Sequence, residues 1–245
     1  MAKTAKKAAK KVSVKKPAKA VAKKPLKAAV ATASGNKQRF TLYGTMTSGP
    51  TYTVGLMLSL CRHPFSYIHV NLREGQHKQP DYLVKNRYGQ VPTLRDGQAF
   101  LVQSAAILEH LAENLKKFDG KTAQERQRIR EWLFWQWDKL SVPVFRLRAR
   151  SRGFRQFGDE VRIMYDTEAK AALASLQHEL MKSEWVAAKR PTVADIGIYA
   201  VLRYGAEANI DLSHYPHVQA WKKRFEALPG FGTPEQILPM ESRLI

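Results

Sequence analysis

The 245-residue chain contains a single cysteine, Cys61, and this scarcity excludes several classes of protein. One thiol cannot form an intrachain disulfide, and it cannot build a cysteine-based zinc site. Long apolar runs are also missing, because no run approaches the about 18 residues that cross a bilayer. The amino-terminal residues include many lysines but no apolar segment of the kind found in secretory signals. We therefore expect a cytoplasmic protein without a membrane span.

Sequence motifs for metal ions and nucleotides are lacking as well. None of the seven histidines belongs to an H-E-x-x-H pattern, and no glycine-rich phosphate loop follows an expected strand. His214 and His217 are three residues apart, but Pro216 lies between them and no third ligand is evident. The sequence therefore predicts no metal site.

Acidic residues are absent from residues 1–37, which carry 12 lysines among alanine, valine and proline. The whole chain has 41 basic and 21 acidic side chains, so removing these 12 lysines leaves 29 against 21. Like charges repel and proline interrupts helices, which predicts a segment that is disordered when free. It resembles the Lys/Ala/Pro tails of histone H1-like proteins and would bind nucleic acid or another polyanion by releasing counterions. A solubilising or targeting tail is the alternative.

From residue 38 the pattern becomes that of a folded domain. Apolar residues from Val54 to Cys61 recur at helical spacing after Pro50, a residue type favoured in the first turn of a helix. Asp96-Gly97 between two apolar segments predicts a tight hairpin. The predicted order is strand 40–43, helix 50–62, strand 65–72, helix 80–85, strands from residue 91 and at 99–102, and a helix from Ser104.

Three short motifs follow one another in this first half. They are Leu42-Tyr43-Gly44 followed by Ser48-Gly49, then Gly89-Gln90-Val91-Pro92-Thr93-Leu94, then Gln103-Ser104-Ala105-Ala106-Ile107-Leu108. In this order and spacing, the chain resembles the glutathione S-transferase family, of the bacterial theta-like or nu-like kind, over residues 39 to 234. The resemblance implies an α+β protein with a thioredoxin-like amino-terminal domain and an all-helical carboxy-terminal domain, preceded by the disordered basic tail.

The second half shows no strand pattern beyond an expected linker at 114–121. Residues 123–139 and 161–182 are predicted to be helical. Thr192-Val193-Ala194-Asp195 predicts a capping box, in which Thr192 begins a helix and Asp195 bonds back to it, so Asp195 is expected to be structural. The predicted boundaries are 1–37 for the tail, 38–115 for the thioredoxin-like domain and 122–245 for the helical domain.

The resemblance places the thiol of glutathione at the start of the helix that Pro50 opens. A free thiol has a pKa of about 8.5, and a helix N-terminus and a hydroxyl donor both favour its thiolate. Ser48 combines the two and is the expected catalytic residue, with Thr45 and Thr47 as alternative hydroxyls. Tyr43 lies in the expected strand and is interpreted as structural. Pro50 departs from the family pattern and removes one backbone N–H from this helix end.

The resemblance also implies how glutathione, a co-substrate rather than a cofactor, is held. The bond between Val91 and Pro92 is expected to be cis, with the backbone N–H and C=O of Val91 facing the cysteinyl part. Gln103 and Ser104 open a helix whose N–H groups and serine hydroxyl suit the γ-glutamyl carboxylate. The family usually adds a lysine or arginine for the glycyl carboxylate, which the sequence does not place.

A run of arginines from Arg146 to Arg155 contains no acidic residue. One interpretation is a solvated or dimer-facing helix end. The other is a site for an acidic co-substrate or a nucleic-acid surface.

The resemblance implies a homodimeric glutathione transferase whose thiolate attacks an electrophilic, hydrophobic small molecule. Conjugation, peroxidase and thiol-exchange chemistry all stay open. The alternative is a non-catalytic binding or regulatory protein on the same scaffold, tethered by its basic tail to nucleic acid or another polyanion, since a fold alone does not fix function.

Overall fold

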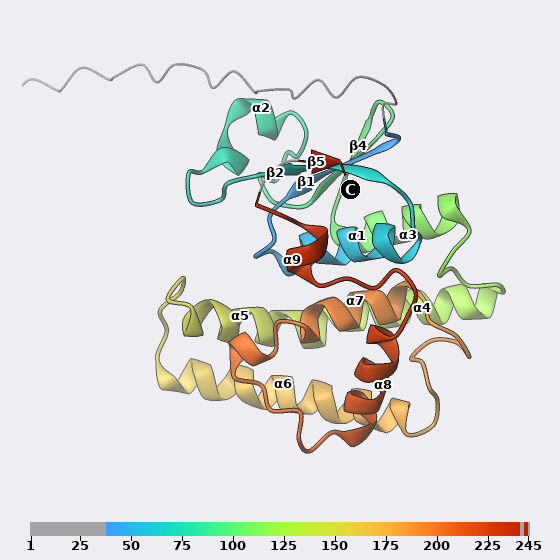
Figure 1. Ribbon diagram of the computed structural model, residues 1–245. Helices are drawn as coiled ribbons and strands as arrows, with labels where there is room; N and C mark the ends of the chain where they lie inside the picture. The colour runs from blue at the N-terminus through green and yellow to red at the C-terminus, as the bar shows by residue number, and fades with distance from the viewer. Residues whose placement is uncertain (1–37, 241–242, 245) are drawn as a thin grey trace, which may run out of the picture. The chain divides into compact units, whose positions relative to one another are not determined.

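The computed structural model describes residues 38–240 and 243–244 (Figure 1). The predicted disorder of residues 1–37 and their likeness to histone H1-like tails lie outside the described residues. Within the described part, a mixed sheet with its helices is followed by a helical region, as the sequence predicts.

The amino-terminal part alternates strands and helices around one sheet. Its elements are β1 (Phe40–Gly44), α1 (Gly49–Leu60), β2 (Phe65–His69), η1 (Gln76–Lys78), α2 (Pro80–Leu83), β3 (Thr93–Asp96), β4 (Ala99–Val102) and α3 (Ser104–Leu115). The strand order is β4-β3-β1-β2-β5, with β1 parallel to β2 and antiparallel to β3. Gly97 closes the β3–β4 hairpin with a φ of 58°, which glycine adopts at no steric cost. This arrangement is the thioredoxin-like half of the predicted fold.

The fifth strand corrects the expectation that the second half contains no strand. Strand β5 (Arg243–Leu244) pairs antiparallel with Ser66 and Tyr67 at the edge of β2. Two residues are too few for an alternating apolar pattern, so nothing in the sequence indicates them. Their strand conformation depends on the backbone donors and acceptors that the edge of β2 offers.

The carboxy-terminal part consists of helices. They are α4 (Ala123–Trp135), η2 (Gln136–Ser141), α5 (Val142–Ser151), α6 (Asp159–Leu180), α7 (Val193–Leu202), η3 (Ala206–Ala208), α8 (Pro216–Glu226) and α9 (Pro234–Ile237). The helix expected at 123–139 continues much further, because α4, η2 and α5 follow one another without a break. Segment η2 is π-helical, and such a turn shifts the faces on which the following side chains lie.

Helix α1 is packed between the sheet and α7 (Figure 1). Of its 12 residues, 10 are buried, and the Tyr52 hydroxyl donates to the carbonyl of Gly232 at 2.9 Å. Apolar residues therefore occupy every side of this helix rather than one stripe. Its N-terminus consequently opens where the sheet domain meets the helical domain.

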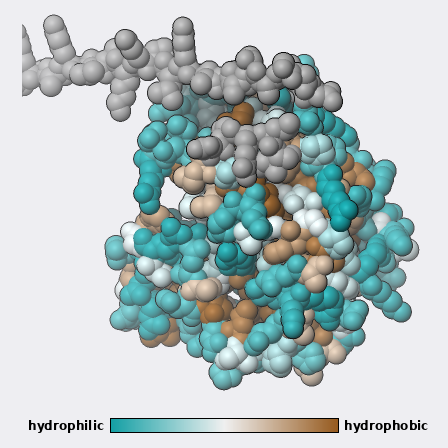
Figure 2. All heavy atoms as spheres, in the orientation of Figure 1, coloured by the Kyte–Doolittle hydropathy of each residue, from teal (hydrophilic) through white to brown (hydrophobic). Residues whose placement is uncertain are grey.

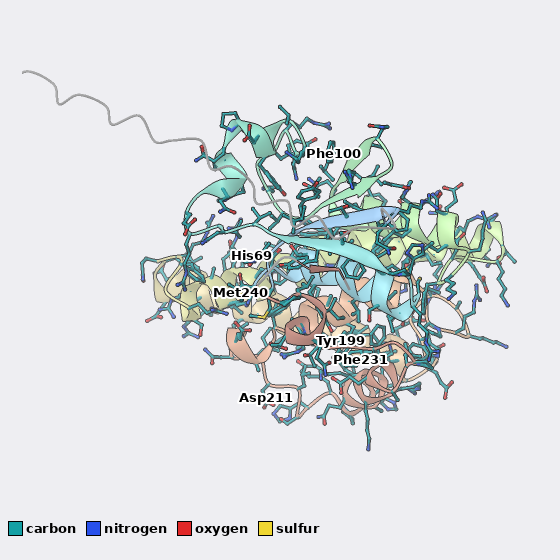
Figure 3. All side chains as sticks on the ribbon, turned by 45° about the horizontal axis from the view of Figure 1, so that its top comes forward. His69, Phe100, Tyr199, Asp211, Phe231 and Met240 are labelled. Carbon is teal, nitrogen blue, oxygen red and sulfur yellow. The ribbon has the colours of Figure 1, made fainter. Side chains whose placement is uncertain are left out.

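The helical domain has an aromatic core. Tyr199 of α7 stacks on Phe225 of α8 with ring centroids 4.4 Å apart, and Phe231 approaches the Tyr199 ring edge-on at 5.5 Å (Figure 3). Aromatic pairs of this geometry add stabilisation beyond their buried area. The cluster fixes α7 against α8 and so supports the surface on which α1 lies.

The capping box at the start of α7 is confirmed. The Asp195 carboxylate is fully buried and accepts hydrogen bonds from Thr192, from the Val186 N–H at 3.1 Å and from the Trp221 indole at 3.0 Å. A buried carboxylate is tolerated only where such donors surround it. Asp195 therefore joins α7, α8 and the preceding loop, which is the structural role expected for it.

The face shown in Figure 2 is covered mainly by hydrophilic residues, with apolar residues in separate patches. Within residues 38–240 and 243–244, no helix is both long and apolar enough to cross a membrane.

Candidate active site

A cavity of about 510 Å³ lies between the sheet domain and segment η2. Its walls come from α1, the η1 region, the loop before β3, the start of α3 and η2. The lining residues are Pro50, Leu72, His77, Lys78, Asn86, Gly89, Gln90, Val91, Pro92, Gln103, Ser104 and Trp137. The four residues expected to hold glutathione, Val91, Pro92, Gln103 and Ser104, thus meet in one cavity. Ser48 is not among the lining residues and lies two positions before Pro50.

The loop before β3 is fixed by a network that the sequence did not reveal. The Val91–Pro92 peptide bond is cis, as expected. Asn86, which is buried, donates to the Gln90 carbonyl at 2.7 Å, and the Tyr82 hydroxyl donates to the same carbonyl at 2.8 Å. Both donors come from α2 or the residues just after it. They hold the loop so that Val91 stays at the cavity wall.

The N-terminus of α3 lies at the cavity wall. Ser104 is buried as the first residue of the helix, and Gln103 precedes it with φ 68° and ψ 109°. A non-glycine residue at such a positive φ is strained, and strained residues cluster at functional sites. The first N–H groups of α3 and the Ser104 hydroxyl are placed to bind a carboxylate.

His77 and Lys78 also line the cavity, on the side formed by η1. The η1 turn begins at Gly75 with φ 70°. Burial, followed by the charge of Lys78, lowers the pKa of His77, so this imidazole is neutral at pH 7 and Lys78 carries the positive charge. The segment shows no periodic pattern, and nothing in the sequence distinguishes these two residues from other basic ones.

The first turn of α1 carries the hydroxyl predicted to be catalytic. The half-buried Ser48 is the N-cap, and its Oγ accepts a hydrogen bond from the Thr51 N–H at 3.2 Å. Its own O–H therefore keeps a donor for another group. Pro50 has no N–H, and within the described residues the Gly49 N–H has no acceptor. The positive end of α1 thus offers one serine O–H and one backbone N–H to an anion.

The packing of Phe145 of α5 against this turn is close at Gly49. A Cβ at this position would lie 2.4 Å from Cζ of Phe145, which is closer than two carbon atoms can approach. The helical domain therefore contacts the turn directly at the residue after Ser48.

The residues of the arginine run have different surroundings, and Arg148 fits neither interpretation of the run. Arg148 is 9% exposed and donates to the Thr47 carbonyl at 2.8 Å, so it is neither a solvated side chain nor one available to a co-substrate. Arg150 pairs with Asp159, and Arg152 pairs with Glu207. These acids follow α5 in the sequence by several residues or more, so the run alone could not indicate the pairing.

Metal chemistry receives no support from the described residues. Within them, no group of three or more histidine, cysteine, aspartate or glutamate side chains could hold a metal ion. Cys61 is buried, and burial, partly offset by Lys117, raises the pKa of its thiol to about 11. This thiol is therefore protonated at pH 7 and is a poor nucleophile.

Two family models match the chain. The glutathione S-transferase N-terminal domain matches residues 38–113, and the glutathione S-transferase C-terminal domain matches residues 158–229. A crystal structure titled as a possible glutathione S-transferase from Rhodopseudomonas palustris is 30% identical, with a TM-score of 0.76. It covers 80% of this chain, and this chain covers 98% of it. The protein therefore belongs to the glutathione S-transferase family.

Curated relatives are similar over most of their length. The probable glutathione S-transferase GSTF2 of Oryza sativa subsp. japonica is 29% identical, over 77% of this chain and 92% of the relative. The disulfide-bond oxidoreductase YfcG of Escherichia coli (strain K12) is 26% identical, over 74% of this chain and 87% of the relative. Members similar to this chain thus carry both transferase and oxidoreductase names.

Two substitutions at the strained residue Gln103 should differ in their effect on stability but not in their effect on glutathione binding. Glycine adopts a positive φ freely, so Gln103→Gly should be more stable than Gln103→Ala by about 1 kcal/mol. Both variants lose the side-chain amide at the cavity and should bind glutathione more weakly than the unmodified protein. Urea denaturation and titration calorimetry measure the two effects. The exposed hairpin residue Gln98 gives a control, since Gln98→Ala should bind normally. A Gly variant less stable than the Ala variant would contradict the role of strain.

Proposed function

We propose that the protein is a glutathione transferase that binds glutathione in the cavity between α1, the cis-proline loop and α3. Family membership and the meeting of four expected ligand residues at one cavity support this function. No contact in the described part of the chain favours the non-catalytic alternative over it. The observation that carries the proposal is the buried Ser104 at an N-terminus of α3 that opens into the same cavity as Val91 and Lys78.

The charges of glutathione match the polar groups around this cavity. The γ-glutamyl carboxylate would bind at Gln103 and Ser104, where helix N–H groups favour an anion. The cysteinyl backbone would pair with the N–H and C=O of Val91 in the loop before β3. The glycyl carboxylate would lie near Lys78, which carries the positive charge of the η1 pair. Pro50 and Trp137 then supply an apolar wall for the hydrophobic electrophile.

The thiolate of bound glutathione would lie at the N-terminus of α1. Lowering a thiol pKa by two units requires about 2.7 kcal/mol of preferential stabilisation of the anion. The Ser48 O–H, the Gly49 N–H and the positive helix end are the groups available for this task. Because the Cys61 thiol is buried with a pKa of about 11, thiol chemistry at this site uses the sulfur of glutathione.

The proposed role of the Ser48 hydroxyl can be tested with one variant that lacks a hydroxyl and one that keeps it. Ser48→Ala should lower kcat at neutral pH about 100-fold, as removal of one donor to a developing anion does elsewhere. The KM for glutathione should change little, because the two carboxylates bind other elements. Ser48→Thr should restore most of the activity, since it keeps both the hydroxyl and the helix cap. Steady-state kinetics with an aryl halide measure both values. A larger loss of kcat in Thr47→Ala than in Ser48→Ala would show that Ser48 does not carry the catalytic hydroxyl.

We also propose the theta-like or nu-like subtype, and the domain boundaries 38–115 and 122–245. The Ser48-Gly49 motif at the start of α1 supports the subtype, and the interval between α3 and α4 supports the boundaries. The choice between conjugation and thiol exchange stays open, because both begin from the same glutathione thiolate. A cytoplasmic location also stays a prediction.

A homodimer is the proposed assembly. Phe134 of α4 is 76% exposed, and an aromatic side chain of this size is common at protein interfaces. Light scattering should give twice the 27.8 kDa mass of one chain. A mass of one chain at micromolar concentration would reject this assembly.

We propose that residues 1–37 bind nucleic acid or another polyanion without reading its sequence. Their 12 lysines and lack of acidic residues support this role. Binding of a DNA duplex to the full chain should weaken by about 1,000-fold between about 50 mM and about 200 mM salt, because counterion release drives it. A chain lacking residues 1–37 should lose this binding and keep its glutathione turnover. A response to salt that persists without these residues would exclude the tail as the binding segment.

A further inference from the structure

The four residues Thr45–Ser48 form a turn that leads from β1 into α1. The Ser48 N–H donates to the Thr45 carbonyl at 3.0 Å and closes the turn. The two central carbonyls both receive donors from the helical domain. The Tyr204 hydroxyl donates to Met46 O at 2.7 Å, and Arg148 Nη1 donates to Thr47 O at 2.8 Å. No residue of the sheet domain supplies either donor.

The peptide unit between Thr47 and Ser48 is therefore held at both ends. Arg148 binds its carbonyl, and Thr45 accepts from its N–H. A peptide unit is planar, so fixing its C=O and its N–H also fixes the position of the next Cα. That Cα belongs to Ser48. The side chain of Ser48 has in addition a defined orientation, because its Oγ accepts from the Thr51 N–H.

Arg148 is itself held rigidly. Its guanidinium lies over the Tyr204 ring at 4.0 Å and donates through Nε to Glu207 at 3.0 Å. Cation–π contact and ion pairing are both stronger where water is excluded, as around this nearly buried side chain. Burial tends to raise the pKa of Glu207, but hydrogen bonds from Arg152 and Arg148 outweigh it and lower this pKa. Glu207 is therefore ionised at neutral pH and anchors Arg148.

The other donor to the turn, the Tyr204 hydroxyl, keeps its proton at neutral pH. Tyr204 is 3% exposed, and burial raises its pKa well above the ordinary range. The charged groups around it are Arg148 and Arg203, which favour the phenolate, and Glu207 and Glu235, which oppose it. The balance leaves the phenol protonated at neutral pH. Its hydroxyl is thus available at this pH to donate to Met46 O.

We propose that Arg148 and Tyr204, anchored by Glu207, are positioning residues for the reacting sulfur. We name these three residues the turn clamp. They set the place of the Ser48 hydroxyl and the Gly49 N–H through the backbone of the turn, without touching glutathione themselves. This inference rests on the proposed function, because it assigns the clamp to the thiolate of bound glutathione. It also makes the catalytic turn of the sheet domain dependent on the helical domain.

The consequences for kinetics follow from where the clamp acts. In the proposed binding mode, α3 and η1 hold glutathione at its two carboxylates, and no clamp residue lines that cavity. Loosening the turn should therefore leave the KM for glutathione nearly unchanged. The thiolate depends on donors aimed at one point, and small displacements of catalytic groups reduce rates strongly. Clamp variants should consequently lose kcat and raise the pKa of the bound thiol.

The structure offers matched controls. Tyr204→Phe removes one buried hydroxyl bonded to the turn, whereas Tyr199→Phe removes one buried hydroxyl bonded to Glu226. Arg148→Lys weakens the contacts of one α5 arginine with Glu207 and with the Thr47 carbonyl, whereas Arg150→Lys weakens the contacts of another with Asp159 and with the Phe157 carbonyl. A loss of general stability affects both members of a pair. A loss of positioning lowers kcat only in the clamp variant of each pair.

The experiment measures steady-state kinetics and the pKa of glutathione bound to the full chain, from the ultraviolet absorbance of its thiolate. We expect Tyr204→Phe and Arg148→Lys to lower kcat about tenfold. They should raise the thiol pKa, with a KM for glutathione within about twofold of the unmodified protein. Tyr199→Phe and Arg150→Lys should match the unmodified protein. Clamp variants with unchanged kcat and thiol pKa, or controls with equal losses, would overturn the proposal. If Tyr204→Phe does not fold, Arg148→Lys decides the outcome.

Amide hydrogen exchange of residues 44–52 gives a readout that does not depend on glutathione. Exchange in this segment should be faster in the two clamp variants than in the two controls. An unmodified protein that binds no glutathione would refute the proposed function, whatever the exchange shows. Binding and turnover by the unmodified protein, with no difference in exchange between variants and controls, would refute the clamp alone.

Discussion

The burial of helix α1 on all sides is the constraint on which the rest of the structure depends. The helix cannot expose any face to water, because 10 of its 12 residues are buried. The sheet covers one side and α7 covers another, so the two domains must stay together for either to be complete. The faces of a helix held in this way are covered, and Pro50 at its N-terminal turn lines the cavity. The candidate active site therefore lies at the junction of the domains, where a helix end, a cis-proline loop and the π-helical segment η2 meet.

Placing a site at this junction creates many buried polar groups, and each must find a partner. Partners come from distant parts of the chain: Asn86 and Tyr82 bind the Gln90 carbonyl, and Tyr204 and Arg148 bind the turn before α1. The same bonds that satisfy these groups also fix the geometry of the site. Stability and preorganisation thus share one network, which is a common property of sites built between domains.

The motifs were sufficient to predict the fold, because they carry backbone requirements that few other folds share. Pro92 at a cis bond, Ser104 at a helix start and the Thr192–Asp195 capping box all depend on local sequence, and the structure has each of them. Lys78 and His77 could not be predicted, because their position depends on how the loop between β2 and α2 folds over the cavity. Strand β5 was missed for a similar reason, since two residues form a strand only by pairing with β2.

The sequence by itself determined most of the order of strands and helices and the residues that cap them, whereas the meeting of Val91, Pro92, Gln103 and Ser104 in one cavity was an expectation from the family resemblance that the structure bears out. The order and the caps follow from spacing and from the conformations that proline, glycine and serine favour over a few residues. Only the tertiary structure decided which arginine of the run between Arg146 and Arg155 would be buried. The residue that reaches Thr47 is 101 positions away from it in the chain. Its charge is tolerable there because Glu207 and the Tyr204 ring lie beside it, and contacts between segments so far apart leave no pattern in a single sequence.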